Sequence, residues 1–435
     1  MRIRDFLEID FILFFAAFVL IAIGVLFIYS SGITSEGVLI YNEYRRQIVW
    51  GAAGLVITLL VTMLNYRRIY DLSLYLYLGT LVLLLFTIIF GRVQYGTRWL
   101  RLGSFGFQAS EFAKISTILF LAWYLDNTKR SQSVFSRFII SSIIVLVPMT
   151  IVLLQPDLGT SLVFIPILLG MTFIAGISLR YIIFLGVTIV LTGFFMVVPI
   201  WQSVIMRNAF PAMMMLVNFR FVGAICMALL LIISIAWFGF TRYGKRYFYW
   251  ICYVAGVLIL SLGTSFAAQK VIKEYQIMRL IVFMDPNVDP RGSGWHIIQS
   301  ITAIGSGGAF GKGFLQGTQS HYRFLPEQST DFIFSILSEE WGFSGGLLVF
   351  ALFLIINLRL IRIMRIAADT YGSYIVAGLA SMFAFHFMIN VGMTMGIMPI
   401  TGIPLMFLSY GGSALFTAMI GIGLAMSVHV RRYHY

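Results

Sequence analysis

The chain has 435 residues, of which 60% are hydrophobic and only 11% are charged, and its formal net charge at pH 7 is +13. Soluble domains carry about 25% charged residues, so this composition excludes a soluble globular protein and indicates an integral membrane protein. The positive charge does not indicate nucleic-acid binding, because Lys and Arg fall mostly in alternate short loops, as the positive-inside rule describes for membrane proteins.

Apolar stretches long enough to cross a bilayer recur from one end of the chain to the other. We therefore predict an all-α fold, a polytopic helical bundle of about twelve transmembrane helices in one domain over residues 1–435, with both termini cytoplasmic. The predicted spans are 10–31, 47–64, 73–91, 110–126, 138–155, 159–176, 181–199, 218–240, 247–266, 331–356, 373–394 and 403–428. Cys226 and Cys252 lie in apolar stretches, which favours buried thiols over a disulfide framework.

An outward loop of medium length covers residues 91–109 and leads into the fourth predicted span, where Glu111 and Lys114 follow. Their three-residue spacing places the carboxylate and the ammonium on one helix face, where they can pair. Charges inside a membrane are costly, so the pair is a functional candidate. A structural ion pair near the interface is the alternative.

Residues 267–330 form one very long polar loop, which we place on the side of the membrane away from the cytoplasm. Its aromatic and apolar residues predict an ordered loop with short or re-entrant helices. Asp285 and Asp289 each precede a proline, which favours extended backbone and presents both carboxylates from turns. Each is a candidate general base, and capping a helix or solvating a turn is the alternative for each.

The glycine-rich stretch 304–313 resembles a phosphate cradle, since backbone N–H groups in such loops bind anions. Its spacing does not match a nucleotide P-loop, but Lys312 and nearby amides are candidates for contact with a pyrophosphate. In the span that follows, Asp331 could complement the helix dipole, and Glu339 lies deeper than a solvated face would place it. The five histidines lack metal-ligand spacing, so we predict no protein metal site.

Four separated strings resemble, in the same order, the signature of the SEDS family (shape, elongation, division and sporulation). They are GTRWLRLGSFGFQASEFAK at 96–114, QPDLGTS at 155–161, the segment from DPNVDPRGSG at 285 to SEEWG at 342, and MPITGIPLMFLSYGGSALF at 398–416. Within the family, the long loop is more similar to the elongation member RodA than to the division member FtsW.

The resemblance implies a peptidoglycan glycosyltransferase that polymerises lipid II and releases undecaprenyl diphosphate during elongation and rod-shape maintenance. It implies a multi-pass protein of the bacterial inner (cytoplasmic) membrane, in contact with membrane lipids, with an extracytoplasmic active site and a class B penicillin-binding protein, a transpeptidase, as partner. A lipid II flippase and a non-catalytic scaffold of the wall-synthesis machinery are the alternatives.

The family's essential aspartate falls on Asp289, which would be the general base. Trp99 offers a face for sugar stacking, and the cations would meet the pyrophosphate. A divalent cation, Mg²⁺ or Mn²⁺, could share that task. The expected substrate-binding residues are Arg98, Trp99, Glu111, Lys114, Arg279, Lys312, Glu327 and Asp331.

The sequence departs from the family in three places. Ala109 stands where proline usually precedes Ser-Glu, and Ser329 stands where histidine commonly precedes Thr-Asp-Phe. A segment at about 200–265 is expected to be an inserted helix pair, added to the family's usual ten spans. An even number of added spans preserves the topology, so Asp289 is expected to stay outside.

Overall fold

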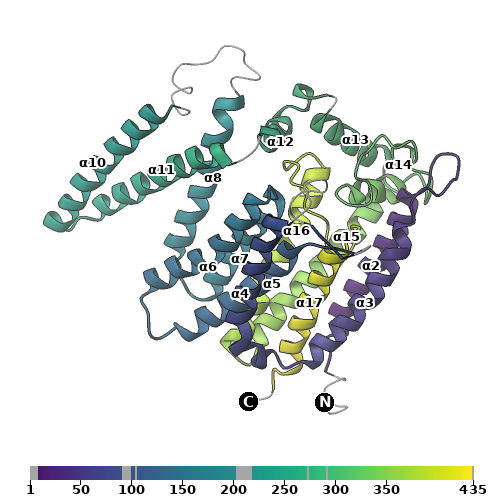
Figure 1. Cartoon of the computed structure of the whole chain (residues 1–435), viewed down its shortest axis with the longest axis horizontal. Coiled ribbons are helices and arrows are strands. Elements are labelled where there is room, and N and C mark those ends of the chain that lie inside the picture. The colour runs from purple at the N-terminus through teal and green to yellow at the C-terminus, as the bar shows by residue number, and fades with distance from the viewer. Residues whose placement is uncertain are drawn as a thin grey trace. The chain divides into compact units, whose positions relative to one another are not determined.

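The computed structural model describes residues 8–90, 99–102, 105–201, 218–271, 274–290 and 292–433, and it is almost entirely helical there. Contacts among the elements divide the chain into two compact units, Met1–Gly176 with Arg291–Tyr435, and Ile177–Pro290. The boundary between the units falls inside the predicted loop 267–330. Figure 1 labels the helices and colours the chain from its N-terminus to its C-terminus.

The larger unit holds most of the helices and the one described strand pair, β1 (Leu100–Leu102) against β2 (Phe105–Phe107), which is antiparallel. Its helices are α2 (Phe11–Ser31), α3 (Glu43–Met63), α4 (Tyr66–Phe90), α5 (Ala109–Asn127), α6 (Val134–Leu154), α7 (Leu158–Ile174), α13 (Ser293–Ser306), α14 (Thr318–His321), α15 (Ile333–Ile366), α16 (Thr370–Thr394) and α17 (Gly412–Val430).

The smaller unit is built on a helical hairpin of α10 (Phe219–Tyr243) and α11 (Arg246–Val271), joined at Gly244 in the left-handed conformation with φ 62°. Helix α8 (Leu179–Trp201) packs on α11, where the Tyr253 hydroxyl donates to the Arg180 carbonyl oxygen at 2.8 Å. The helix α12 (Glu274–Met284) and the 3₁₀ turn η4 (Pro286–Val288) follow. The predicted inserted pair at 200–265 falls in this unit, and its residues 202–217 lie outside the described residues.

Each of the twelve predicted spans coincides with one long helix, which confirms the predicted all-α membrane fold. Ten described helices are long and apolar enough to cross a bilayer. Helix α7 is apolar but has 17 residues, and α5 has 19 residues including the charged Glu111, Lys114 and Asp126. The predicted loop 267–330 contains the short helices α12, α13 and α14, as expected.

The predicted boundaries were wrong at the last span, which was expected to begin at 403 but begins at Gly412. Segment 398–411 is not helical because Pro404 lacks a backbone N–H, and Gly402 and Phe407 adopt φ of 71° and 70°. Other residues hold its backbone: Asn390 donates to the Ile403 carbonyl oxygen at 2.8 Å. Helix α15 in turn runs ten residues beyond its predicted end at 356.

Helix α17 lies in the core of the larger unit, beside α3 and α16. Small residues let α3 approach it closely: a Cβ at Gly423 would lie 2.9 Å from the Thr58 carbonyl oxygen. Thr58 also donates its hydroxyl to the Met419 carbonyl oxygen at 2.9 Å. Small residues and interhelical hydrogen bonds are the usual means of helix association in membranes, where lipid is as apolar as the helix surface.

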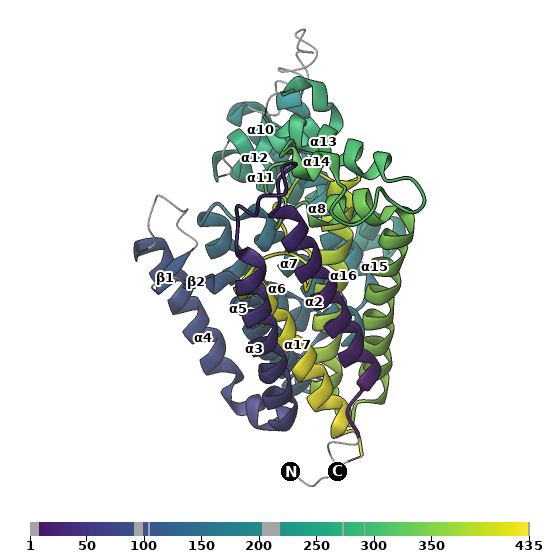
Figure 2. The same ribbon diagram turned by 90° about the vertical axis from the view of Figure 1, so that its right-hand side faces the viewer.

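The start of α2 and the end of α17 lie at the same end of the larger unit, as Figure 2 shows. Arg432 of the C-terminal turn lies 4.0 Å from the Glu8 carboxylate. Asp10, the N-cap of α2, accepts from Arg359 near the end of α15, with Nε to Oδ2 at 2.8 Å. These ion pairs tie the start of α2 to the end of α15 and to the C-terminal turn.

Candidate functional site

Asp285 and Asp289 flank η4 in the smaller unit, and the structure gives them different tasks. The Asp285 carboxylate is the N-cap of η4 and accepts from the Asn287 backbone N–H at 3.0 Å and from its side-chain amide at 3.1 Å. Asp289 follows the turn as its C-cap residue, with φ −132° and ψ 70°, and is partly exposed. The capping role considered for both aspartates is thus taken by Asp285.

Glu111 and Lys114 form a fully buried ion pair near the start of α5. The Lys114 Nζ lies 2.8 Å from both carboxylate oxygens of Glu111, and the side chains are 0% and 2% exposed. The predicted pairing is therefore present. The Lys114 ammonium also lies 3.1 Å from Nε2 of His386 on α16. A buried charge is tolerated when it is paired and hydrogen-bonded, as this one is.

His386 was considered in the sequence only as a metal ligand, and its contact with Lys114 was missed. Its Nδ1 lies 3.2 Å from the Pro404 carbonyl oxygen in segment 398–411. An ionisable residue in the middle of an apolar span was the signal that could have found it. Asn390, four residues later on α16, was missed as well and contacts the carbonyl oxygens of Asp331 and Ile403.

Lys312 and Glu339 form a second ion pair, where the long loop meets α15. The Lys312 Nζ lies 2.8 Å from Oε1 of Glu339 and 2.7 Å from the Thr318 hydroxyl. Glu339 also accepts the backbone N–H groups of Thr318 and Gln319 at 2.8 and 2.9 Å, so its carboxylate fixes the start of α14. The Lys312 side chain is 27% exposed and can still reach a ligand outside the protein.

Glu340, next to Glu339, is fully buried and holds the other side of the same loop. It accepts the Leu315 backbone N–H at 3.0 Å and the Ser30 hydroxyl of α2, and its Oε1 lies 3.6 Å from Nε2 of His321. Two adjacent carboxylates thus tie segment 312–321 to the helices beneath it.

The end of the glycine-rich stretch packs its backbone against α15, whereas Gly305 and Gly308 are exposed. Helix α15 is interrupted at Gly342, with φ 64° and ψ −157°, so nearby carbonyl groups lose their helical partners. Lys312 N–H donates to the Glu339 carbonyl oxygen at 3.0 Å and Gly313 N–H donates to that of Glu340 at 2.9 Å. These amides are engaged within the protein, and a pyrophosphate contact by the Lys312 side chain stays a prediction.

We expect Gly311→Ala to destabilise the protein far more than Gly308→Ala does. Gly311 has φ 80°, and a Cβ there would lie 2.0 Å from the Glu340 carbonyl oxygen; Gly308 has φ 57° with nothing within 4 Å. Left-handed backbone alone costs about 1–2 kcal/mol, and the added clash should bring Gly311→Ala to about 3 kcal/mol or more. Thermal unfolding of the two variants in detergent measures the difference. Equal losses would contradict the close packing of this stretch on α15.

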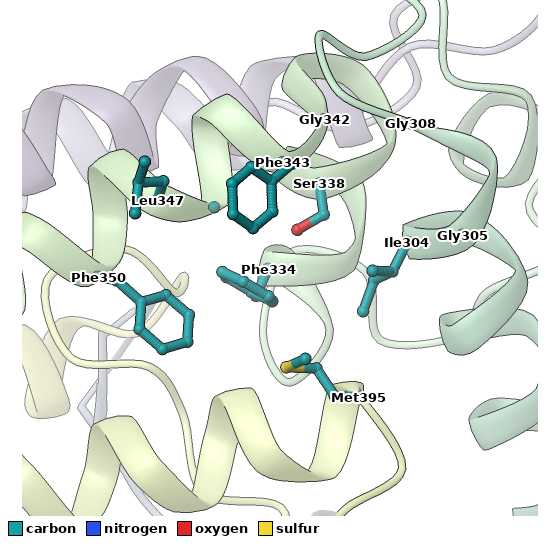
Figure 3. Close-up of a pocket in the computed structure, with 11 residues that line it drawn as sticks. Ile304, Gly305, Gly308, Phe334, Ser338, Gly342, Phe343, Leu347, Phe350 and Met395 are labelled. Carbon is teal, nitrogen blue, oxygen red and sulfur yellow. The ribbon is translucent and has the colours of Figure 1, made fainter.

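An apolar groove of about 400 Å³ lies between α13, α15 and the end of α16. Figure 3 shows the rings of Phe334, Phe343 and Phe350 beside it, with Met395 on the opposite wall. The predicted site residues do not line it, and its lining suits a hydrocarbon rather than a charged group.

Polar contacts hold the described end of the loop before α5. Gln108 donates its side-chain amide to the Asp157 carboxylate at 2.9 Å, and its backbone N–H to the Ser413 hydroxyl at 3.1 Å. Asp157 is also the N-cap of α7. Trp99, partly exposed, packs over Gly106 of β2, where a Cβ would lie 3.2 Å from its ring. Three of the family-like strings therefore meet here.

The remaining predicted residues belong to different parts of the chain. Arg98 lies outside the described residues, and Arg279 lies half-buried on α12 in the smaller unit. Glu327 is exposed, with φ 48°, and accepts the Thr330 hydroxyl at 3.2 Å. Asp331 is partly buried two residues before α15. The roles expected of these residues toward a substrate stay predictions.

Within the part of the chain that the structure describes, no group of three or more His, Cys, Asp and Glu side chains could hold a metal ion. Mg²⁺ commonly binds through one or two carboxylates together with substrate phosphates, so a divalent cation stays a proposal.

The chain matches the family model described as cell cycle protein, FtsW/RodA/SpoVE, over residues 11–208 and 213–434. It is 49% identical over 440 residues to the peptidoglycan glycosyltransferase RodA of Treponema pallidum, covering 99% of this chain and 100% of that protein. It is 34% identical to the peptidoglycan glycosyltransferase MrdB of Escherichia coli, covering 89% and 86% of the two chains.

Solved structures of similar proteins share the fold of this chain. A chain from a structure described as the coordination of polymerization and crosslinking by a peptidoglycan synthase complex is 25% identical, with a TM-score of 0.65 over 98% of this chain and 99% of that chain. The rod shape determining protein RodA of Thermus thermophilus, 23% identical, shares the fold with a TM-score of 0.60 over 98% of each chain.

Proposed function

The chain belongs to the FtsW, RodA and SpoVE family of cell cycle proteins, and we propose that it polymerises lipid II into glycan strands during cell elongation, with Asp289 as the general base. The protein is a multi-pass membrane glycosyltransferase. The observation that carries the proposal is the 49% identity, over 99% of the chain, to a protein named for that activity.

In the proposed reaction, Asp289 takes the proton from a sugar hydroxyl of one lipid II molecule. The hydroxyl oxygen bonds to the anomeric carbon of a second molecule, and the bond from that carbon to undecaprenyl diphosphate breaks. The leaving diphosphate takes the electron pair, so cations beside it lower the barrier. Asp289 lies on a partly exposed turn after η4, where a substrate hydroxyl outside the protein can approach it.

Three cations are proposed to contact the diphosphate: Lys312, which is partly exposed, Arg279, which is half-buried, and Arg98. Trp99 is proposed to stack on a sugar. Glu327 and Asp331 are proposed to contact the polar part of the substrate from the loop before α15. A divalent cation, Mg²⁺ or Mn²⁺, would neutralise diphosphate charge.

Glu111 and Lys114 are buried together, and we propose that they act on the diphosphate through their charges rather than through direct contact. Their charges are held in place by the fold, so they can shape the field at the diphosphate without reorganising during the reaction.

We also propose that the protein lies in the bacterial inner membrane with both termini cytoplasmic and its site outside. The basic residues at the shared end of α2 and α17 support this orientation. A class B penicillin-binding protein is the proposed partner, and the similarity to a chain of a peptidoglycan synthase complex supports it.

The experiment that tests this function supplies labelled lipid II to the purified protein with its partner in liposomes. We expect glycan strands and released undecaprenyl diphosphate. Translocation of lipid II across the bilayer without polymerisation would show a flippase instead. Neither activity, in a preparation that still binds the partner, would show a scaffold.

A further inference from the structure

His386 lies at the junction of three elements of the larger unit. Its ring, 1% exposed, projects from α16 and contacts the Lys114 ammonium on one side and the Pro404 carbonyl oxygen on the other. Asn390, one turn further along α16, holds the preceding carbonyl group, that of Ile403. Two side chains on one face of α16 therefore hydrogen-bond to consecutive residues of segment 398–411. Of the two, only His386 also contacts Lys114.

The chemistry of the three groups determines the tautomer of the ring. A carbonyl oxygen only accepts, so Nδ1 of His386 must carry the proton that it donates to Pro404. The neutral ring then has a lone pair at Nε2, which faces the Lys114 ammonium at 3.1 Å. An ammonium only donates, so this is the one neutral tautomer that satisfies both neighbours.

The Lys114 ammonium is thereby held from two directions. Glu111, on its own helix, supplies the opposite charge, and His386 supplies a neutral acceptor from a different helix. Glu111 holds the ammonium only from one turn away on the same helix. A second acceptor on α16 fixes where the positive charge lies relative to segment 398–411.

We propose that His386 is a positioning residue: its Nε2 lone pair holds the buried Lys114 cation in register with segment 398–411. This inference rests on the proposed function in one respect only, because it assigns the catalytic benefit of that register to the glycosyl transfer. The contact itself is independent of the reaction.

The first test compares His386→Leu with His386→Gln in lipid II polymerisation by the full chain with its partner. Leucine removes the acceptor, so kcat should fall about tenfold, the cost of one hydrogen bond to a charged group, while KM changes less than about twofold. Glutamine can donate to Pro404 and accept from Lys114, so kcat should return to within about threefold of the original chain. Unchanged kcat in His386→Leu, or equal losses in both variants, would overturn the proposal.

The second test needs no activity and uses the shift in Tm of a double-mutant cycle. In the Lys114→Met background the Nε2 acceptor has lost its donor, so His386→Leu should cost less than roughly half of the Tm loss that it causes in the original chain. Asn390→Leu is the matched control, since it loosens the same segment without a contact to Lys114, and its Tm loss should be the same in both backgrounds.

The two tests separate the possible failures. If the original chain does not polymerise lipid II but the cycle shows coupling, the proposed function is wrong and the contact stands. If the original chain polymerises lipid II but the Tm losses of His386→Leu are equal in both backgrounds, the positioning role is wrong and the function stands.

Discussion

Replacing Asp289 with Asn should lower kcat for lipid II polymerisation by at least about 100-fold, because a positioned general base contributes about 10²–10⁴ to a rate. Asparagine has nearly the same shape but cannot take the proton from the attacking hydroxyl. The KM for lipid II and the Tm should change little, since the carboxylate lies on a partly exposed turn after η4 rather than in the core. Steady-state kinetics of the complex with the partner measure both constants.

Asp285→Asn is the matched control for this prediction. Asp285 caps η4 through the Asn287 backbone N–H, and asparagine caps a helical turn about as well as aspartate does. The control should keep kcat within a few-fold of the original chain. Full activity in Asp289→Asn, or a larger loss in Asp285→Asn, would assign the base to another residue.

Lys114→Met should be the most destabilising single change at the buried cluster, by about 3–5 kcal/mol, because it leaves the Glu111 carboxylate buried without its cation. Lys312→Met breaks a pair whose lysine is 27% exposed, and the buried Glu339 carboxylate keeps the N–H groups of Thr318 and Gln319, so the loss should be smaller. Chemical or thermal unfolding in the same detergent compares the two. Equal losses would contradict the difference in burial.

The double variant Glu111→Gln with Lys114→Met separates stability from activity. Removing both charges avoids the unpaired carboxylate, so most of the stability should return. Polymerisation should stay low, since the positive charge proposed to support the diphosphate is gone. A double variant that regains both stability and activity would reduce the pair to a structural role.

Hydropathy predicted the membrane helices well because each span must hide its backbone polar groups in a helix of roughly fixed length. The Glu111–Lys114 contact also followed from the sequence, since three-residue spacing on one helix fixes the geometry of such a pair. Local spacing cannot predict contacts between distant helices. The third member of the cluster, His386, lies 272 residues from Lys114 in the sequence and was missed.

Segment 398–411 shows a second limit of the sequence pattern. Its apolar residues have the hydropathy of a membrane helix, and the predicted span began at 403 for that reason. Its non-helical backbone is held by partners from other segments: Tyr410 N–H donates to the Ser329 carbonyl oxygen at 2.8 Å, and Ser409 donates to that of Thr330 at 2.6 Å. Such tertiary contacts override local preference.

The two aspartates of the long loop could not be told apart by their Asp-Pro pairs alone, and the choice of Asp289 came from the family resemblance. The structure adds a physical difference, because Asp285 is the cap of η4. The composition of the glycine-rich stretch indicated contact with an anion. The structure shows that the amides of Lys312 and Gly313 complete the hydrogen bonding of the interrupted helix α15, and the anion contact of the Lys312 side chain stays a prediction.

The most direct measurement of the central claim follows glycan strands made from labelled lipid II by the complex, with the partner's transpeptidase blocked by a β-lactam. With crosslinking stopped, any strands come from polymerisation alone. We predict long uncrosslinked strands with the original chain and with Asp285→Asn, and none above background with Asp289→Asn. Strands of equal length and yield with Asp289→Asn would contradict the account.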